Sequence, residues 1–195
     1  MVEDLRASRF PDAAIVFIPA AVSPFKTGRP GTDPTLRARM IALAATKIAH
    51  GGVWTDEIDR ARAGEPSYMI ETLRRLRIVA PHVMPILVIG SDQAAAFHRW
   101  REPREILRLA EVVVLPREPI GGSSAFREAL TSVRYWDPTE VESWVHAMAD
   151  VPADPVSSTR IRERIAEEGV DAIDPRDIDP EVAAFIRANH LYASE

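Results

Sequence analysis

The sequence predicts an α/β protein with a Rossmann-like, doubly wound parallel sheet and flanking helices. Compact apolar runs at residues 14–19, 84–89 and 112–115 have the composition of strands buried on both faces of a parallel sheet. Segments with apolar residues at helical spacing lie between these runs, and many of the 16 prolines fall at the boundaries. Strands that alternate with helices indicate parallel βαβ units.

The elements follow from local patterns along the chain. Leu36, Met40 and Leu43 recur at helical spacing and predict a helix over residues 35–50, which Gly51-Gly52 should end. A short second strand is expected over residues 53–59. A loop is expected over residues 20–34, and a flexible turn is expected over residues 121–124. The remaining helices are expected at residues 2–9, 67–79, 94–100, 103–110, 125–136, 139–149, 157–169 and 180–190.

Composition narrows the function classes. The chain has 195 residues, 46% of them apolar, which suits a single domain over residues 1–195 with a C-terminal helical part from about 157. A net charge of −5 argues against general binding of nucleic acid or acidic membranes. The chain has no cysteine and no histidine pair at metal-ligand spacing, so no metal site is expected. Without a signal peptide or a membrane-spanning run, a cytoplasmic location is the default expectation.

The segment Val156-Ser157-Ser158-Thr159-Arg160-Ile161-Arg162 carries the strongest functional signal. It places hydroxyl and guanidinium groups where a helix is expected to begin. The first turn of a helix offers unpaired N–H groups and a positive dipole end, and arginine adds a planar two-pronged donor. Such a site suits a polyphosphate tail, whereas an ordinary capped surface helix is the alternative interpretation.

A second group of polar residues follows the predicted strands. Gly90 and Asp92 come directly after the strand at 84–89, and Lys26 lies in the loop after the strand at 14–19. Ligands bind at the carboxyl edge of open α/β sheets, so these residues are candidate ligand contacts.

The chain resembles the nicotinate-nucleotide adenylyltransferase family, a branch of the HIGH-motif nucleotidyltransferases. The resemblance covers nearly the whole chain and depends on the combination of several segments. These segments are Phe17-Ile18-Pro19, Ser23-Pro24-Phe25-Lys26, Arg37 with Met40, Glu57-Ile58, Pro66-Ser67-Tyr68 with Thr72-Leu73, Ile89-Gly90-Ser91-Asp92 with Phe97 and Trp100, Arg117, Val156 to Arg162, and His190-Leu191-Tyr192.

The resemblance implies transfer of the adenylyl group of ATP to nicotinate mononucleotide, with Mg²⁺ accompanying ATP. It implies that Lys26 and Arg162 neutralise charge in the transition state. The implied ATP contacts are Gly90, Asp92, Ser157, Ser158, Thr159 and Arg162. The implied mononucleotide contacts are Ser67, Tyr68, Trp100 and Arg117, with Trp100 beside the nicotinate ring. The expected partners are these two small molecules, with no nucleic acid or membrane, and pairing of identical chains is left open.

Three departures from the family pattern stand out. The chain has no counterpart of the family's first strand and H-x-G-H signature. Phe25 stands where the family has histidine, and Met69 stands where it has threonine. Either the sequence is part of a longer gene product, or it is a diverged homologue with impaired or no catalysis that still binds nucleotides. An adenylyltransferase for another phosphomonoester is a further alternative.

Overall fold

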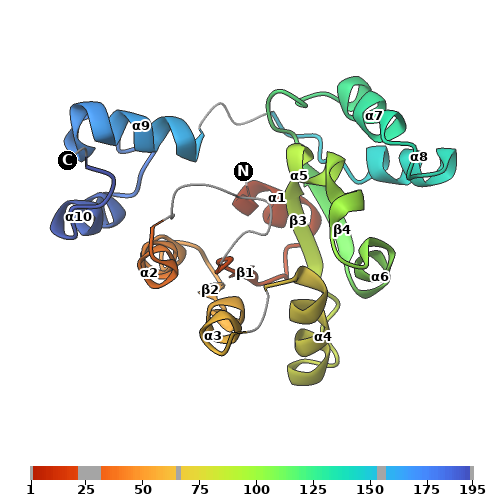
Figure 1. Ribbon diagram of the computed structural model, residues 1–195, viewed down its shortest axis with the longest axis horizontal. Helices are drawn as coiled ribbons and strands as arrows, with labels where there is room; N and C mark the ends of the chain where they lie inside the picture. The colour runs from red at the N-terminus through yellow and green to blue at the C-terminus, as the bar shows by residue number, and fades with distance from the viewer. Residues whose placement is uncertain (1, 22–31, 65–66, 153–156, 194–195) are drawn as a thin grey trace. The chain divides into compact units, whose positions relative to one another are not determined.

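The computed structural model describes residues 2–21, 32–64, 67–152 and 157–193 (Figure 1). It divides into two compact units. The first unit comprises Met1–Leu5 and Tyr68–Pro155, and the second comprises Arg6–Ser67 and Val156–Glu195. Helix α1 (Val2–Arg9) runs across the boundary between them. The second unit therefore combines an early and a late part of the chain.

The second unit is built around a pair of short parallel strands. Strand β1 (Ile15–Phe17) pairs with β2 (Gly51–Val53), so that Ile15 lies opposite Gly51. The helices of this unit are α2 (Pro34–Ala45), α3 (Asp56–Arg62), α9 (Ser158–Glu168) and α10 (Pro180–Ala188), with the 3₁₀ turn η2 (Val170–Ala172).

Among the described residues, two apolar clusters stabilise the second unit. Ile165, Ile173 and Ile186 are 3–5% exposed and pack together from α9, the segment after η2, and α10, with Met40 of α2 against them. A smaller cluster joins Ala21, Ala38 and Ile58. The C-terminal helices are therefore anchored to α2 by apolar burial, the dominant favourable term in folding.

The first unit holds the better-buried strand pair. Strand β3 (Ile86–Gly90) pairs in parallel with β4 (Glu111–Leu115), from Ile86 opposite Glu111 to Gly90 opposite Leu115. The helical elements of this unit are α4 (Met69–Val79), α5 (Ser91–Ala95), the 3₁₀ turn η1 (Phe97–Arg99), α6 (Pro103–Leu109), α7 (Ser123–Ser132) and α8 (Pro138–His146).

The core of the first unit is large and apolar. Its fully buried members come from the strands and the surrounding helices, namely Ile70, Ala94, Phe97, Ile106, Val114, Phe126 and Leu130. The last four residues of β4, Val112 to Leu115, are all buried, and none of them is more than 9% exposed. The packing of this core holds β3 and β4 in place. The loops at their carboxyl ends therefore start from fixed positions.

The predicted α/β class, with parallel strands and flanking helices, is confirmed. The helices expected at 2–9, 67–79, 103–110, 157–169 and 180–190 are present with ends shifted by at most two residues. Val16 of β1 is 53% exposed, so the expectation that this strand is buried on both faces is wrong. The expected turn at 121–124 is shorter, because Gly122 precedes α7 in extended conformation. In the described part of the chain, no helix is long and apolar enough to cross a membrane.

The helix expected over 35–50 ends earlier, at Ala45. Thr46 caps it, with its backbone N–H donating to Ala42 and its hydroxyl donating to the Leu43 carbonyl at 2.7 Å. The chain then turns back so closely that a Cβ on Gly51 would lie 2.7 Å from the Ala45 oxygen. The glycine is therefore needed for a close approach of backbone, not to stop the helix.

The strand expected over 53–59 is wrong, because most of this segment is α3. Asp56 and Glu57 lie in its first turn and Arg60 and Arg62 in its last turn, which suits the helix dipole. Arg60 also pairs with Asp56 at 2.8 Å, and both side chains are buried. Opposite charges four residues apart favour a helix, and in this segment they indicate the secondary structure better than the apolar residues do.

Candidate functional site

The carboxyl ends of β3 and β4 are tied together by one buried side chain. The Ser91 hydroxyl donates to the Arg117 carbonyl at 3.1 Å and accepts from the Arg117 N–H at 2.9 Å. Ser91 is fully buried. The segment that follows β4 is thus fixed to the start of α5, and this places Arg117, a predicted mononucleotide contact, next to Gly90.

Gly90 and Asp92, two predicted ATP contacts, lie against each other. A Cβ built on Gly90 would meet Asp92 Oδ1 at 2.5 Å and Arg117 Cδ at 3.4 Å. Asp92 Oδ1 is itself buried and has no hydrogen-bond partner among the described residues. Because an unpaired buried carboxylate oxygen is costly, this atom is suited to accept a hydrogen bond from a ligand.

Trp100, the residue expected beside the nicotinate ring, is half-buried at the edge of the same core. Its ring stacks on Phe97, with centroids 4.6 Å apart and planes 27° apart. The indole Nε1 is buried without a hydrogen-bond partner in the part of the chain that is described. Phe97 therefore fixes the indole, and one polar atom is left for a further partner.

Tyr68, Arg101 and Glu102 form a charged group beside Trp100. The Arg101 guanidinium lies over the Tyr68 ring, 4.9 Å from its centroid. Glu102 accepts from Arg74 through both oxygens, at 2.7 and 3.2 Å. The Arg74 hydrogen bond lowers the pKa of Glu102 below its ordinary value, and the same bond raises the pKa of Arg74. These four side chains, from Tyr68 at the N-cap of α4, from α4 itself and from the turn before α6, are thereby held in place.

Ser67, the fourth predicted mononucleotide contact, belongs to the second unit. Its hydroxyl donates to Glu57 Oε2 at 2.5 Å, and Glu57 is 4% exposed. The serine is therefore fixed by α3, and its hydroxyl proton is directed at the protein. The serine oxygen keeps lone pairs with which it can accept from a ligand.

The tip of α9 has the capped geometry that the sequence predicts. The Ser157 hydroxyl accepts from the Arg160 N–H at 3.2 Å, and Arg162 Nη2 donates to Thr159 Oγ1 at 3.3 Å. Ser158, Thr159 and Arg162 are exposed, and the first turn carries no acidic residue. One orphan N–H is thus used by the cap, and the first turn itself contributes no carboxylate near the positive end of the helix dipole.

Lys26 lies outside the described residues, but Arg37 binds both sides of the segment that contains it. Arg37 donates to the carbonyl of Ala21 at 2.8 Å and to the carbonyl of Thr32 at 3.1 Å. Residues 22–31 connect these two positions. Arg37 of α2 is therefore a positioning residue for the ends of this segment.

The structure brings together Gly90, Asp92 and Arg117, and it gives Tyr68 and Trp100 defined settings in the same unit. Sequence reasoning assigned no role to Ser91, Arg37 or Arg101. Ser91 and Arg37 belong to segments that resemble the family, and this resemblance is the sequence feature that could have indicated their roles. For Arg101, the sequence offers no indication of a role except that it directly follows Trp100.

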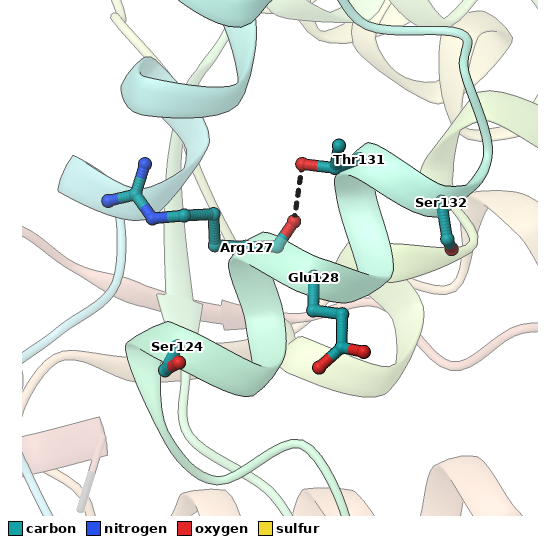
Figure 2. Close-up of a pocket in the computed structure, with 5 residues that line it drawn as sticks. All are labelled: Ser124, Arg127, Glu128, Thr131 and Ser132. Carbon is teal, nitrogen blue, oxygen red and sulfur yellow. Dashed lines mark hydrogen bonds between the residues drawn. The ribbon is translucent and has the colours of Figure 1, made fainter.

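A hollow of about 400 Å³ on α7 does not fit a ligand site. Its lining comes from one helix, namely Ser124, Arg127, Glu128, Thr131 and Ser132. Figure 2 shows that these side chains do not converge on one point, and Arg127 is paired with Glu142. Binding sites need a few convergent polar groups, so this surface is ordinary. Among the described residues there is also no group of three side chains suited to hold a metal ion.

A family model described as cytidylyltransferase-like matches residues 5–164. The probable nicotinate-nucleotide adenylyltransferase of Chromobacterium violaceum is 31% identical over 184 residues, which cover 90% of this chain and 82% of that protein. The corresponding protein of Methylibium petroleiphilum is 32% identical over 91% of this chain and 77% of its own length. That of Methylacidiphilum infernorum is 28% identical, and the match spans 66% of its length.

Solved structures show the same fold. The nicotinic acid mononucleotide adenylyltransferase of Plasmodium falciparum, complexed with NaAD, superposes with a TM-score of 0.64 at 16% identity. The superposition covers 98% of this chain and 88% of that one. The same protein complexed with APC gives a TM-score of 0.62.

Proposed function

Because the chain belongs to the cytidylyltransferase-like family and, within it, to the nicotinate-nucleotide adenylyltransferases, we propose that it transfers the adenylyl group of ATP to nicotinate mononucleotide. A phosphate oxygen of the mononucleotide attacks the α-phosphorus of ATP in line. The bond from that phosphorus to the bridging oxygen of the β-phosphate breaks. The products are nicotinate adenine dinucleotide and pyrophosphate, so the protein is a nucleotidyltransferase of NAD biosynthesis.

The single observation that carries this proposal is the likeness to relatives of that name over nine-tenths of this chain. The geometry of the described residues supports it. Gly90, Asp92 and Arg117 gather at the carboxyl ends of β3 and β4, where ligands bind in open α/β folds.

Each candidate contact has a role in this reaction. Trp100 and Tyr68 hold the nicotinate end, and Ser67 and Arg117 contact the mononucleotide. Asp92 accepts from ribose hydroxyls of ATP, with Gly90 leaving room for its carboxylate. The tip of α9, with Ser157, Ser158, Thr159 and Arg162, binds the triphosphate.

Catalysis in this proposal is a matter of alignment and charge. Phosphoryl-type transfers need the two anions in line and their charge neutralised, without a covalent enzyme intermediate. Lys26 and Arg162 supply that positive charge. Mg²⁺ enters bound to ATP, because phosphate oxygens are the ligands that this ion prefers. We expect the reaction in the cytoplasm, and pairing of identical chains stays open.

The test is pyrophosphate release from ATP and nicotinate mononucleotide by the purified chain. We expect turnover, and we expect Arg162→Ala to lower kcat/KM by roughly a hundredfold, the usual effect of removing one transition-state donor. Arg164→Ala is the matched control, since Arg164 lies on the same helix but pairs with Glu168 at 3.2 Å. Equal losses in both variants would show that the arginine at 162 has no special role.

A binding protein without turnover is the second candidate, and Met69 favours it. The family has threonine here, whereas Met69 begins α4 and packs against the core of the first unit. A hydroxyl is thus replaced by an apolar side chain. Calorimetric binding of ATP or the mononucleotide with no pyrophosphate release would support this candidate. Turnover with another phosphomonoester, but not with nicotinate mononucleotide, would instead show that the chain uses a different acceptor.

A further inference from the structure

The hydroxyl of Ser91 is directed entirely at one other residue of the candidate site. Ser91 is 0% exposed, so the hydroxyl does not reach a ligand. Its oxygen accepts from the Arg117 N–H at 2.9 Å, and its proton is donated to the Arg117 carbonyl at 3.1 Å. A serine hydroxyl has a single proton to donate. Any effect of this hydroxyl on substrate binding must therefore pass through Arg117.

The backbone of Arg117 is fixed by these two bonds and by a third. Its carbonyl also accepts from the Ile120 N–H at 2.8 Å, so both backbone polar groups of Arg117 are satisfied within the protein. The chain enters this position from β4, whose last residue, Leu115, lies opposite Gly90 of β3. The direction in which the Arg117 side chain leaves the backbone is thus set by the protein.

The side chain of Arg117 itself stays available. It is exposed, and its aliphatic stem lies against Gly90, since a Cβ built there would meet Arg117 Cδ at 3.4 Å. The same Cβ would meet Asp92 Oδ1 at 2.5 Å, an oxygen without a hydrogen-bond partner in the described part of the chain. The Arg117 guanidinium likewise forms no ion pair with any residue that the structure describes. A cation and a carboxylate therefore flank Gly90, and each is free to bind a ligand.

We infer that Ser91 is a positioning residue for the mononucleotide: its hydroxyl fixes Arg117 where the guanidinium binds this anionic substrate. The inference rests on the proposed function, in which Arg117 contacts the mononucleotide and Asp92 contacts ATP. The position of Asp92 depends on Gly90 and on α5, and neither uses the Ser91 hydroxyl. A side chain that must be ordered at the moment of binding costs affinity. Loss of the hydroxyl should therefore weaken binding of the mononucleotide and spare ATP.

The experiment is a double-mutant cycle on Ser91 and Arg117, measured by calorimetric binding of nicotinate mononucleotide and, separately, of ATP to the whole chain. We expect Ser91→Ala to weaken mononucleotide binding about tenfold and to leave ATP binding unchanged. Arg117→Ala should weaken mononucleotide binding by at least the same factor. Adding Ser91→Ala to Arg117→Ala should have no further effect, because a residue that acts through another is not additive with it.

The control is Leu130→Ala, which removes a fully buried side chain of α7 from the core of the same unit. Its folded form should bind both substrates as the wild type does, which separates positioning from a loss of stability. Thermal unfolding shows that each variant is folded at the temperature of the titration. If Ser91→Ala does not fold, Ser91→Cys replaces it in the cycle, because a thiol fills the site as a weaker donor and acceptor.

Three results would overturn the inference and leave the proposed function intact. The first is an equal loss of affinity for ATP and the mononucleotide in the Ser91 variant, which would show a general structural role. The second is a further loss when that variant is combined with Arg117→Ala. The third is unchanged mononucleotide affinity in either single variant. Binding of neither substrate by the folded wild type would instead overturn the proposed function, and the inference with it.

Discussion

At the end of β3, position 90 has no room for a side chain, and glycine is therefore required there. Its backbone has φ −72° and ψ 154°, which any residue can adopt. A Cβ there would nevertheless meet Asp92 Oδ1 at 2.5 Å. The glycine therefore fixes where the Asp92 carboxylate lies, and a side chain at position 90 acts on the candidate site through Asp92.

We predict that Gly90→Ala weakens ATP binding about tenfold, the effect of losing roughly one hydrogen bond to a charged group. The carboxylate is the movable end of a side chain, so we expect the melting temperature to change little. Gly122→Ala is the matched control, because a Cβ on Gly122 meets nothing within 4 Å. Calorimetry with ATP on both variants makes the comparison. Unchanged ATP affinity in Gly90→Ala would show that the Asp92 carboxylate does not contact the nucleotide.

The sequence predicts the roles of some single residues in the candidate site but not of others. Gly90 and Asp92 were predicted as neighbours of a ligand, because a glycine and an acid after a buried strand are typical of the sheet edge. The role of Ser91 could not be predicted, because its partner Arg117 is 26 residues away, in the segment that follows β4. Pairings of this kind depend on strand register, which only the folded sheet defines.

At the scale of elements, α8 shows how a local signal fixes a helix start. Asp137 accepts from the Glu140 N–H at 2.9 Å, and Glu140 accepts from the Asp137 N–H at 2.9 Å, which forms a reciprocal capping box. Glu140 also accepts from Arg104 of α6 at 2.9 and 3.0 Å. The start of α8 is thereby fixed both by its own backbone and by a neighbouring helix.

This arrangement predicts a pH dependence. The Arg104 hydrogen bonds, with that from the Asp137 N–H, lower the pKa of Glu140 below its ordinary value. A carboxyl with a lowered pKa in the folded state binds protons more readily when the chain unfolds. Its stabilising effect is therefore present above the ordinary pKa of glutamate and is lost as the pH falls below it.

We expect the free energy of unfolding to decrease as the pH falls from about 5 to 3, and Glu140→Gln to show a smaller decrease over this range. Glu105→Gln is the control, since Glu105 pairs with a largely exposed Arg108 and should alter the pH profile little. Urea unfolding at a series of pH values measures both. Identical pH profiles for the wild type and Glu140→Gln would contradict the role assigned to the ion pair.

Elements with a strong local signal were predicted well. The helices at 157–169 and 180–190 were predicted from hydroxyl or proline starts and apolar spacing, and α9 and α10 lie within two residues of those bounds. Residues 53–59 do not form the expected strand, because their apolar run is short and the charges of α3 at helical spacing favour a helix.

At the scale of the whole molecule, each of the two units has apolar clusters of its own among the described residues. The core of the first unit is centred on residues such as Phe126 and Leu130, and that of α9 and α10 on Ile165 and Ile186. The sequence predicted a helical C-terminal part from about 157, but not that it packs with residues 6–67. Apolar periodicity shows which face of a helix is buried, while its partner depends on long-range packing that no local pattern encodes.

The apolar clusters of the two units predict two regions of different local stability. Leu130→Ala and Ile186→Ala each remove a buried aliphatic side chain and should cost about 2–5 kcal/mol. We expect Leu130→Ala to accelerate amide hydrogen exchange mainly in the first unit, including β3 and β4. Ile186→Ala should accelerate it mainly in α2, α9 and α10, because cooperative units open as contiguous packed regions.

Ile78→Ala is the control for this comparison, since Ile78 is 78% exposed and its truncation leaves no cavity. Exchange measured by mass spectrometry on the intact chain separates the two units peptide by peptide. If either core substitution accelerated exchange equally in both units, the chain would open as one cooperative body. The strand pair β1–β2 would then share its stability with β3–β4, rather than depend on the apolar contacts of α2 with the C-terminal helices.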